Sequence, residues 1–171
     1  MRVLYCTVGM PASGKSTTLY GLGLNDYTIS SDKIRELVSE YSYKYLPNEN
    51  NKLGTNGIVT KNLSNKKDHQ VWKMLYDIVE HRMKQGETIF IDSTMLFKGA
   101  FKTINKLRKK YYYRVHLIDF RHQNTNVTFD EVVEHNLTLE RQRDHKVVPE
   151  DVLADYWKRE ENVILPMTLN P

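Results

Sequence analysis

The sequence has few of the features that mark secreted or membrane proteins. Cysteine occurs once, at Cys6, so no disulfide can form within the chain. No apolar run approaches the ~20 residues that a membrane-spanning helix needs. Residues 1–8 are too short for a signal peptide and lack its small-residue cleavage pattern, and they are expected to form a buried strand. These absences predict a cytoplasmic protein, because thiols stay reduced there.

Motifs of two other protein classes are also missing. The six histidines show no metal-ligand spacing such as H-E-x-x-H. The segment 105–108, Asn-Lys-Leu-Arg, begins like the N-K-x-D motif of guanine-specific proteins but lacks its aspartate. The sequence therefore indicates neither a histidine metal site nor specificity for guanine.

The composition is that of a folded domain with a mild positive charge. Of the 171 residues, 40% are apolar and 27% are charged, and the formal net charge is +4. These proportions are typical of globular proteins, and the length suits a single domain spanning residues 1–171. The net charge is compatible with a polyanionic partner but does not demand one.

Apolar runs and helical periodicities alternate along the chain. This alternation predicts an α/β fold of the P-loop kinase type, with a central parallel sheet of four or five strands flanked by helices. Residues 41–67, rich in Asn, Gly, Lys and Tyr, interrupt the pattern and are expected to form a long surface loop. Gly86 is expected to end a helix. Strands are expected at 3–8, 27–30, 88–92 and 114–120, and helices at 15–22, 33–40, 68–85, 98–110, 128–140 and 149–161.

A phosphate-binding loop is the clearest motif. Residues 9–16, Gly-Met-Pro-Ala-Ser-Gly-Lys-Ser, match G-x-x-x-x-G-K-S in full, between an expected strand and an expected helix. Its glycines let backbone N–H groups surround a phosphate. Lys15 supplies positive charge to the β- and γ-phosphates, and the Ser16 hydroxyl binds Mg²⁺. ATP and Mg²⁺ are therefore the predicted cofactors. The predicted ATP-binding residues of the loop are Gly9, Ala12, Ser13, Gly14, Lys15, Ser16 and Thr17, of which Lys15 is also catalytic.

The segment after the second expected strand carries a candidate general base. Asp32 can accept the proton of an attacking hydroxyl. Arg35 follows three residues later on the same helical face and can hold a phosphate of the acceptor by a two-pronged contact. Both residues are predicted to be catalytic and to bind substrate. In the alternative, Asp32 only caps the helix and Arg35 is a solvated surface charge.

A second carboxylate, Asp92, ends the third expected strand. A carboxylate at this place suits Mg²⁺ binding, directly or through water, together with Ser16. Asp92 can also orient Arg35 and so belong to the substrate-binding side of the site. In the remaining alternative it caps the turn that follows the strand.

The charged segment 141–146 is expected to form a lid loop over the triphosphate. Arginines in such a lid neutralise charge in the transition state. Arg143 is the first choice for this catalytic, ATP-binding role, and Arg141 is the second. In the alternative, the segment is a solvated turn in which one arginine pairs with Glu140 or Glu150.

In combination these segments resemble the kinase domain of the phage-type polynucleotide 5′-kinases, an end-healing family in which that domain is joined to a 3′-phosphatase. The resemblance implies a 5′-hydroxyl kinase acting on the ends of RNA or DNA. By this similarity, Asp32 is the base for the 5′-hydroxyl, Arg35 holds the 3′-phosphate of the terminal nucleotide, and Arg143 binds ATP. The shared features are the phosphate loop extending to Thr17, the Asp32–Arg35 spacing, the strand end Asp92-Ser93, the run from Arg143 to Asp151, Tyr-Lys-Tyr at 43–45 and Gly-Ile-Val-Thr at 57–60.

The sequence also departs from that family. Ser30-Ser31 precede Asp32, where the family has a pair of the Asn-Arg type. No D-x-D-G-T motif occurs, so the 3′-phosphatase activity is expected to be absent. The tyrosines and lysines of residues 41–67 can stack bases and follow phosphates, or the segment is a lysine-rich loop whose tyrosines pack on the core.

Three alternatives to a polynucleotide kinase remain open. The first is a kinase for a small or tRNA-linked hydroxyl, carried by a sugar, a nucleoside or an aminoacyl-tRNA. The second is a zeta-toxin-like kinase that acts on an activated sugar. The third is a nucleotide-binding regulatory module without transfer activity, which Asp32 and Arg35 argue against because a binding module needs no base.

Overall fold

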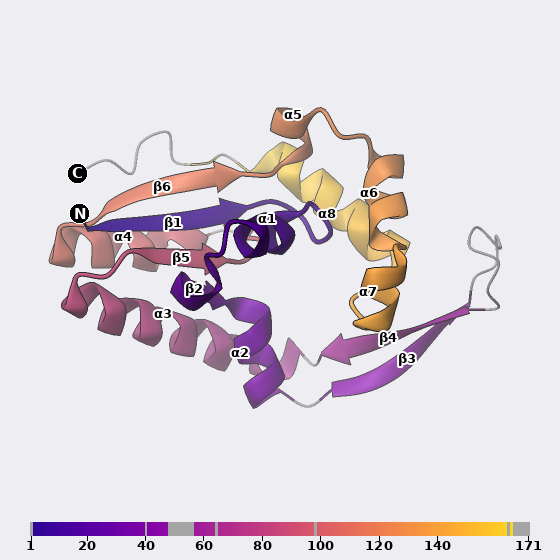
Figure 1. Cartoon of the computed structure of the whole chain (residues 1–171), viewed down its shortest axis with the longest axis horizontal. Coiled ribbons are helices and arrows are strands. Elements are labelled where there is room, and N and C mark those ends of the chain that lie inside the picture. The colour runs from indigo at the N-terminus through magenta and orange to yellow at the C-terminus, as the bar shows by residue number, and fades with distance from the viewer. Residues whose placement is uncertain are drawn as a thin grey trace.

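The predicted parallel sheet forms, and it has four strands in the order β2-β5-β1-β6 (Figure 1). The computed structural model describes residues 2–39, 41–47, 57–63, 65–97, 99–163 and 165. The four strands lie within two residues of their predicted bounds, and the α/β fold class is confirmed. They are β1 (Val3–Val8), β2 (Thr28–Ser30), β5 (Ile89–Asp92) and β6 (Arg114–Asp119).

Strand β1 lies inside the sheet because its sequence is apolar on both faces. Leu4, Cys6 and Val8 on one face have no exposed area, and Val3 and Thr7 on the other face are buried as well, as expected for a strand covered by helices on both sides. Leu4 pairs with Ile89 of β5, and Val8 pairs with Asp119 of β6. The parallel register brings the carboxyl ends of all four strands to one edge of the sheet, where ligands bind in folds of this kind.

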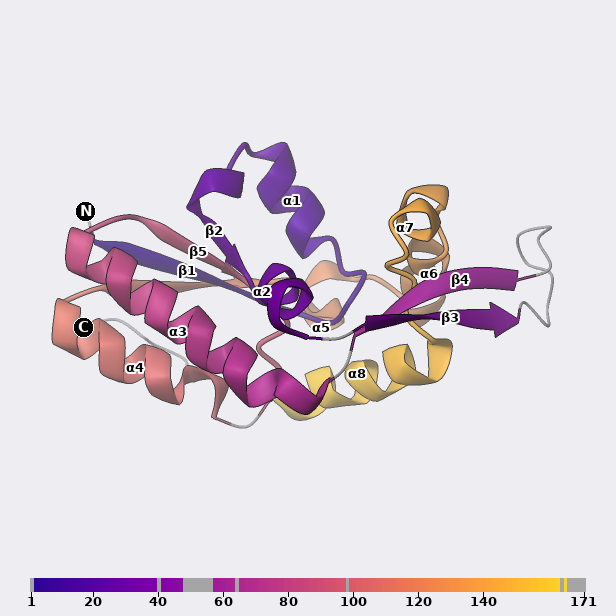
Figure 2. The same cartoon turned by 90° about the horizontal axis from the view of Figure 1, so that it is seen from below.

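Helices cover both faces of the sheet. In Figure 2, α1 lies on one face, while α3, α4 and α8 lie on the other. The expected helix at 128–140 is two helices, α6 and α7, and a short helix, α5, precedes them. The helices are α1 (Lys15–Gly21), α2 (Ser31–Val38), α3 (Asp68–Gln85), α4 (Ala100–Tyr111), α5 (His122–Thr125), α6 (Phe129–Asn136), α7 (Leu139–Arg143) and α8 (Glu150–Asn162), with single 3₁₀ turns η1 (Asn25–Tyr27) and η2 (Asn65–Lys67).

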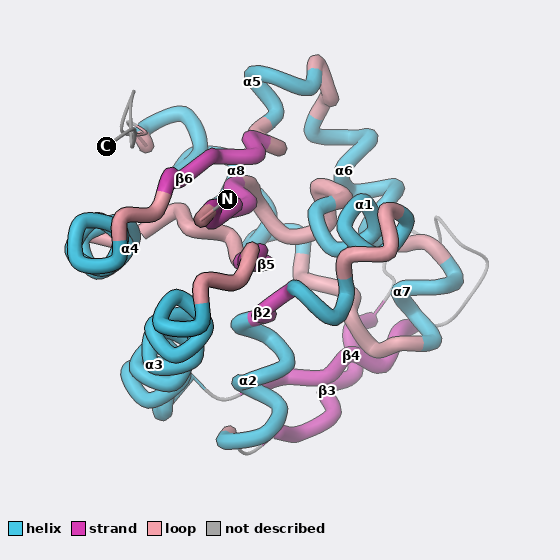
Figure 3. The backbone as a smooth tube through the Cα atoms, turned by 60° about the vertical axis from the view of Figure 1, so that its left-hand side comes forward, coloured by secondary structure: helices cyan, strands magenta, loops and turns pink. Residues whose placement is uncertain are grey.

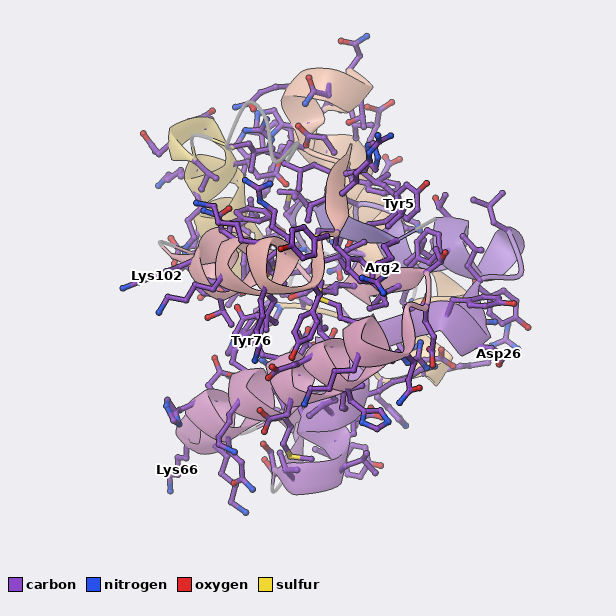
Figure 4. The ribbon with its side chains drawn as sticks, turned by 90° about the vertical axis from the view of Figure 1, so that its left-hand side faces the viewer. Arg2, Tyr5, Asp26, Lys66, Tyr76 and Lys102 are labelled. Atoms are coloured by element: carbon purple, nitrogen blue, oxygen red, sulfur yellow. The ribbon has the colours of Figure 1, made fainter. Side chains whose placement is uncertain are left out.

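The longest helix, α3, confirms the helix that the spacing of apolar residues predicted. Its buried residues recur every four positions and form one apolar stripe: Val71, Leu75, Val79 and Met83. Gly86 ends the helix in the left-handed conformation, as predicted, and its N–H donates to the carbonyl oxygen of Met83. On another side of α3, the Tyr76 hydroxyl donates to the carbonyl oxygen of Ala100, and its side chain lies between α3 and α4 in Figure 4.

The long loop expected at 41–67 is wrong for most of that segment. Strands β3 (Tyr41–Pro47) and β4 (Gly57–Leu63) form an antiparallel hairpin separate from the main sheet. The aromatic residues of β3 and the β-branched residues of β4 favour strands, a signal that the polar residues between them concealed. Residues 48–56 lie outside the described part of the chain.

The charged loop expected at 141–146 is also partly wrong, because α7 continues through Arg143. The hairpin and α7 lie beyond the carboxyl ends of the sheet strands and contact one another, and the hairpin begins just after α2 (Figure 3). The helices of the described residues include none that is both long enough and apolar enough to span a membrane.

Candidate active site

The phosphate-binding loop connects β1 to α1 and keeps the conformation that its glycines allow. Gly9 has φ 149° and Gly14 has φ 87°, both in the range that side chains rarely adopt. A Cβ atom on Gly9 would lie 3.0 Å from the Cβ of Phe120 and 3.0 Å from the Oγ of Ser13. Gly9 is therefore required by close packing as well as by its φ angle.

Lys15 begins α1 and is buried against the loop. Its Nζ donates to the carbonyl oxygen of Met10 at 2.5 Å and to Ser13 Oγ at 3.2 Å. Burial lowers the pKa of Lys15 to about 8, against the opposing effect of the nearby carboxylates, of which Asp92 and Asp32 act most strongly. The loop thus holds a desolvated cation where a phosphate would be stabilised by it.

Ser16 and Asp92 meet as the sequence predicted for a metal site. The Ser16 hydroxyl donates to Asp92 Oδ2 at 2.6 Å, and Asp92 is buried at the end of β5. A hydroxyl and a carboxylate are oxygen ligands, which Mg²⁺ prefers. Within the described residues no cluster of three or more His, Cys, Asp or Glu side chains occurs. Mg²⁺ takes few protein ligands and completes its shell with phosphate oxygens and water, so the Ser16 hydroxyl and the Asp92 carboxylate could hold it.

Asp32 and Arg35 lie side by side on α2. Arg35 Nη1 is 2.7 Å from Asp32 Oδ1, and Arg35 Nη2 is 2.7 Å from Asp68 Oδ1. The side chain of Asp32 is 79% exposed, whereas that of Arg35 is 15% exposed. Asp32 is thus open to a ligand while Arg35 is held between two carboxylates. Asp68, in the first turn of α3, was missed by the sequence reasoning because nothing local relates it to α2.

The two serines that precede Asp32 have structural roles. Ser30 is the N-cap of α2, and its side chain accepts a hydrogen bond from the backbone N–H of Lys33. The alternative in which Asp32 caps this helix is therefore wrong. Ser31 is buried, and its hydroxyl lies 3.2 Å from that of Ser93 at the end of β5.

The two lid arginines point in different directions. Arg141 is largely buried. Burial lowers its pKa, and the nearby charge of Asp32 opposes that effect. The positive charge of Arg141 in turn lowers the pKa of Lys15. Its Nη2 donates to the carbonyl oxygen of Lys146, and within the described residues its buried Nε has no hydrogen-bond partner. Arg143 is exposed to solvent. The structure thus brings Arg141, the second choice, towards Lys15 and Asp32, and it turns Arg143 outward.

Comparison with known proteins agrees with this architecture. The sequence matches the family described as AAA domain over residues 4–161. The chain belongs to the AAA domain family. This AAA domain also has 52 matches among solved protein chains. One is a protein from Chloroflexus aurantiacus J-10-fl described as a candidate kinase, with a TM-score of 0.58 and 18% identity over 92% of this chain and 78% of that chain. At 18% identity this similarity shows a shared fold, which is of the P-loop kinase type. A search of curated proteins found no match.

A buried carboxylate on the last helix of the AAA domain holds the phosphate loop in place. Glu160 has no exposed area, and its Oε1 accepts a hydrogen bond from the Met10 N–H at 2.5 Å. Its Oε2 accepts from the backbone N–H and the Nδ1 of His122, at 3.0 and 2.7 Å. The His122 ring stacks on Trp157 with ring centres 3.7 Å apart. Glu160 lies on the same face of α8 as Leu153 and Trp157, and a charged residue on an apolar face could have indicated this role from sequence.

A pocket of about 210 Å³ opens beside the phosphate loop. Its walls are mostly apolar. The residues of these walls that lie outside the phosphate loop were not predicted from sequence. His135 contributes to one wall, and its Nδ1 donates to the carbonyl oxygen of Ala12 at 2.5 Å. The size and the apolar lining suit a flat heterocyclic base attached to phosphates held by the loop. Other residues beyond the loop that line the pocket are Phe120, His122, Thr125, Val127, Glu131 and Val132.

The hairpin β3–β4 is joined to the segment that follows α7. The Thr60 hydroxyl donates to the carbonyl oxygens of Val147 and His145, the latter at 3.2 Å. His145 Nδ1 donates to the carbonyl oxygen of Val59 at 3.0 Å. The ring of Tyr43 meets that of His145 edge to face, with centres 5.1 Å apart. The hairpin after α2 and the segment that carries Arg141 therefore form one connected surface.

Proposed function

We propose that this protein is a polynucleotide kinase that transfers the γ-phosphate of ATP to the 5′-hydroxyl end of RNA or DNA. The observation that carries the proposal is the arrangement of Asp32, an exposed carboxylate whose charge reaches both Lys15 in the phosphate loop and Arg141 on α7. A carboxylate in that position meets the requirement for a base that activates a hydroxyl against a bound triphosphate.

The donor side of the site suits ATP. The backbone of the phosphate loop and the Lys15 ammonium would hold the phosphates, and Arg141 has a buried N–H without a partner in the described chain. Ser16 and Asp92 would hold Mg²⁺, and the ion would neutralise charge on the β- and γ-phosphates. The apolar pocket beside the loop would take the adenine base.

The acceptor side is organised around α2. The Asp32 carboxylate would accept the proton of the 5′-hydroxyl as that oxygen bonds to the γ-phosphorus and ADP leaves. Arg35 orients Asp32 through their 2.7 Å contact and places positive charge beside it, where a phosphate of the acceptor strand would lie. Asp68 holds Arg35 from the opposite side at the same distance. The ordered resemblance to phage-type polynucleotide kinases supports this assignment of roles.

The decisive experiment measures transfer of labelled γ-phosphate from ATP to 5′-hydroxyl RNA and DNA oligonucleotides, beside nucleosides, sugars and aminoacyl-tRNA. Asp32→Ala is expected to lower kcat by roughly 10²–10⁴-fold, the usual contribution of a general base, while ATP binding persists. Asp26→Ala is the matched control, because Asp26 is exposed in η1, before the start of β2 (Figure 4).

Two results would count against the proposal. Transfer to a sugar or an aminoacyl-tRNA in preference to every oligonucleotide would replace the polynucleotide with one of the alternative acceptors. Activity of Asp32→Ala above about a tenth of wild type would remove Asp32 as the base, since general-base assistance is larger than that.

A further inference from the structure

The hairpin belongs to a basic segment of the chain. Residues 41–67 contain five lysines and a single acidic residue, Glu49, which is a net charge of +4 and equals the net charge of the whole chain. Lys44 on β3 and Lys67 in η2 are exposed, and Lys66 extends outward from the surface in Figure 4. Positive charge of this kind attracts a polyanion to the hairpin.

The hairpin also presents an exposed aromatic face. Tyr43 and Tyr45 lie two residues apart on β3, so their side chains share one face. Val59 pairs directly with Tyr45 across the hairpin and belongs to the same face. Tyr43 is 58% exposed, Tyr45 55% and Val59 42%. His145, in edge-to-face contact with Tyr43, borders this face on the α7 side.

The position of the hairpin links this face to the acceptor site. β3 begins three residues after α2 ends, and α2 carries Asp32 and Arg35. The other strand, β4, is bonded through Thr60 to the segment after α7. Figures 1 and 2 show the hairpin starting near α2, passing alongside α7 and extending away from the sheet. A strand whose 5′ end lay at Asp32 would leave the site beside this surface.

We propose that the hairpin face formed by Tyr43, Tyr45 and Val59 binds the single-stranded acceptor behind its terminal nucleotide. The tyrosine rings stack on bases, and the exposed lysines near the hairpin, Lys44, Lys66 and Lys67, attract the phosphates of the strand to it. Aromatic stacking combined with a basic track is the usual means of binding single strands without sequence preference. This inference rests on the proposed function, and it adds that the enzyme gains from acceptors longer than one nucleotide.

The test compares acceptors of different length at saturating ATP. The acceptors are a nucleoside 3′-monophosphate and 5′-hydroxyl oligo(dT) and oligo(rU) of two to twelve nucleotides. For the wild type, kcat/KM is expected to rise with length over the first several nucleotides. In Tyr43→Thr/Tyr45→Thr, the ratio of kcat/KM for the octanucleotide to that for the monophosphate is expected to fall by roughly 5- to 150-fold for each lost stacked base.

Matched variants separate stacking from folding. Threonine keeps the strand propensity of these positions, and the Tyr43→Phe/Tyr45→Phe variant is expected to restore the ratio because it keeps both rings. Tyr27→Thr is the control, since Tyr27 is 52% exposed but lies in η1 before β2. Lys44→Gln is expected to lower the slope of log affinity against log salt by about 0.7 if it removes one phosphate contact, whereas Lys102→Gln on α4 leaves the slope unchanged.

The outcomes distinguish this inference from the proposed function. Oligonucleotides that are phosphorylated with a kcat/KM independent of length would overturn the hairpin proposal and leave the kinase assignment standing. A tyrosine double variant that changes the sedimentation coefficient of the protein while keeping the length dependence would show that the face binds a second copy, and would also overturn it. Failure to phosphorylate either the monophosphate or any oligonucleotide would remove both.

Discussion

Binding of ATP is expected to take up a proton at alkaline pH, because of the environment of Lys15. Burial lowers the pKa of its ammonium group to about 8, so the free protein carries a mixture of charged and neutral Lys15 near that pH. Asp92, Asp32 and Glu160 favour the charged form and Arg141 disfavours it. A bound triphosphate adds several negative charges beside Nζ and returns the pKa towards its ordinary range.

The magnitude follows from that pKa. About half of the Lys15 side chains are neutral at pH 8 and roughly nine tenths at pH 9, so binding takes up about 0.5 and about 0.9 proton respectively. The apparent affinity for ATP is then expected to fall about tenfold between pH 7 and pH 9. ATP affinity falls as pH rises because the charged form of Lys15 binds the phosphates. The affinity is highest below the pKa of Lys15 in the free protein and decreases above it.

The proton can be counted by calorimetry. ATP is titrated into the protein without acceptor at pH 7, 8 and 9, in two buffers of different ionisation enthalpy, and the difference in heat gives the number of protons taken up. The phosphates of ATP are already ionised above pH 8, and burial raises the pKa of Cys6 to about 12, so neither interferes. Lys15→Met is the control and is expected to abolish the uptake.

One result would refute this reasoning. If the wild type takes up no more protons at pH 9 than Lys15→Met does, then Lys15 is fully charged in the free protein. Burial against the phosphate loop would then not control its protonation, and the weakening of ATP binding at alkaline pH would need a different cause.

Two further predictions concern residues that only the structure singled out. Arg141→Ala is expected to lower kcat by roughly 10²–10³-fold, the usual effect of removing one group that stabilises transition-state charge. Arg143→Ala is expected to change kcat by no more than about fivefold, because Arg143 is exposed. Initial rates at saturating ATP test both variants, and a larger effect of Arg143→Ala would favour Arg143, the first choice from sequence. Glu160→Gln is expected to lower the free energy of unfolding by about 1.5–3 kcal/mol, because the carboxylate accepts a hydrogen bond from the Met10 N–H, and to raise the KM for ATP. Urea unfolding and steady-state kinetics test both parts, with exposed Glu161→Gln as control; a loss of stability without a change in KM would contradict a role in holding the phosphate loop.

The predictions that succeeded from sequence were those with a strong local pattern. The phosphate loop needed only its own residues and the apolar strand before it. The α3 stripe and its end at Gly86 followed from helical spacing and from the left-handed conformation that glycine adopts easily. Asp92 could be placed near Ser16 because parallel strands end at one edge of the sheet, and the 2.6 Å contact between them agrees with that reasoning.

The predictions that failed concerned segments whose structure depends on contacts distant in sequence. The hairpin of β3 and β4 pairs residues from Tyr41 to Leu63, and the polar stretch between its strands concealed the pairing. The sequence also could not show that Arg141, rather than the first choice Arg143, is the side chain whose charge acts on Lys15, because the direction of a side chain on α7 depends on how that short helix packs against β4.

The sequence by itself determined the α/β class, the phosphate loop and the identity of the polar residues that end each strand. These follow from side-chain periodicity and from the backbone freedom of glycine, which act over a few neighbouring residues. Only the tertiary structure decided that Glu160 bonds to Met10, that Asp68 holds Arg35 and that Arg141 turns inward. Such contacts join residues far apart in the chain, and they form only where the packing of whole helices and strands brings a buried polar group to a partner that satisfies it.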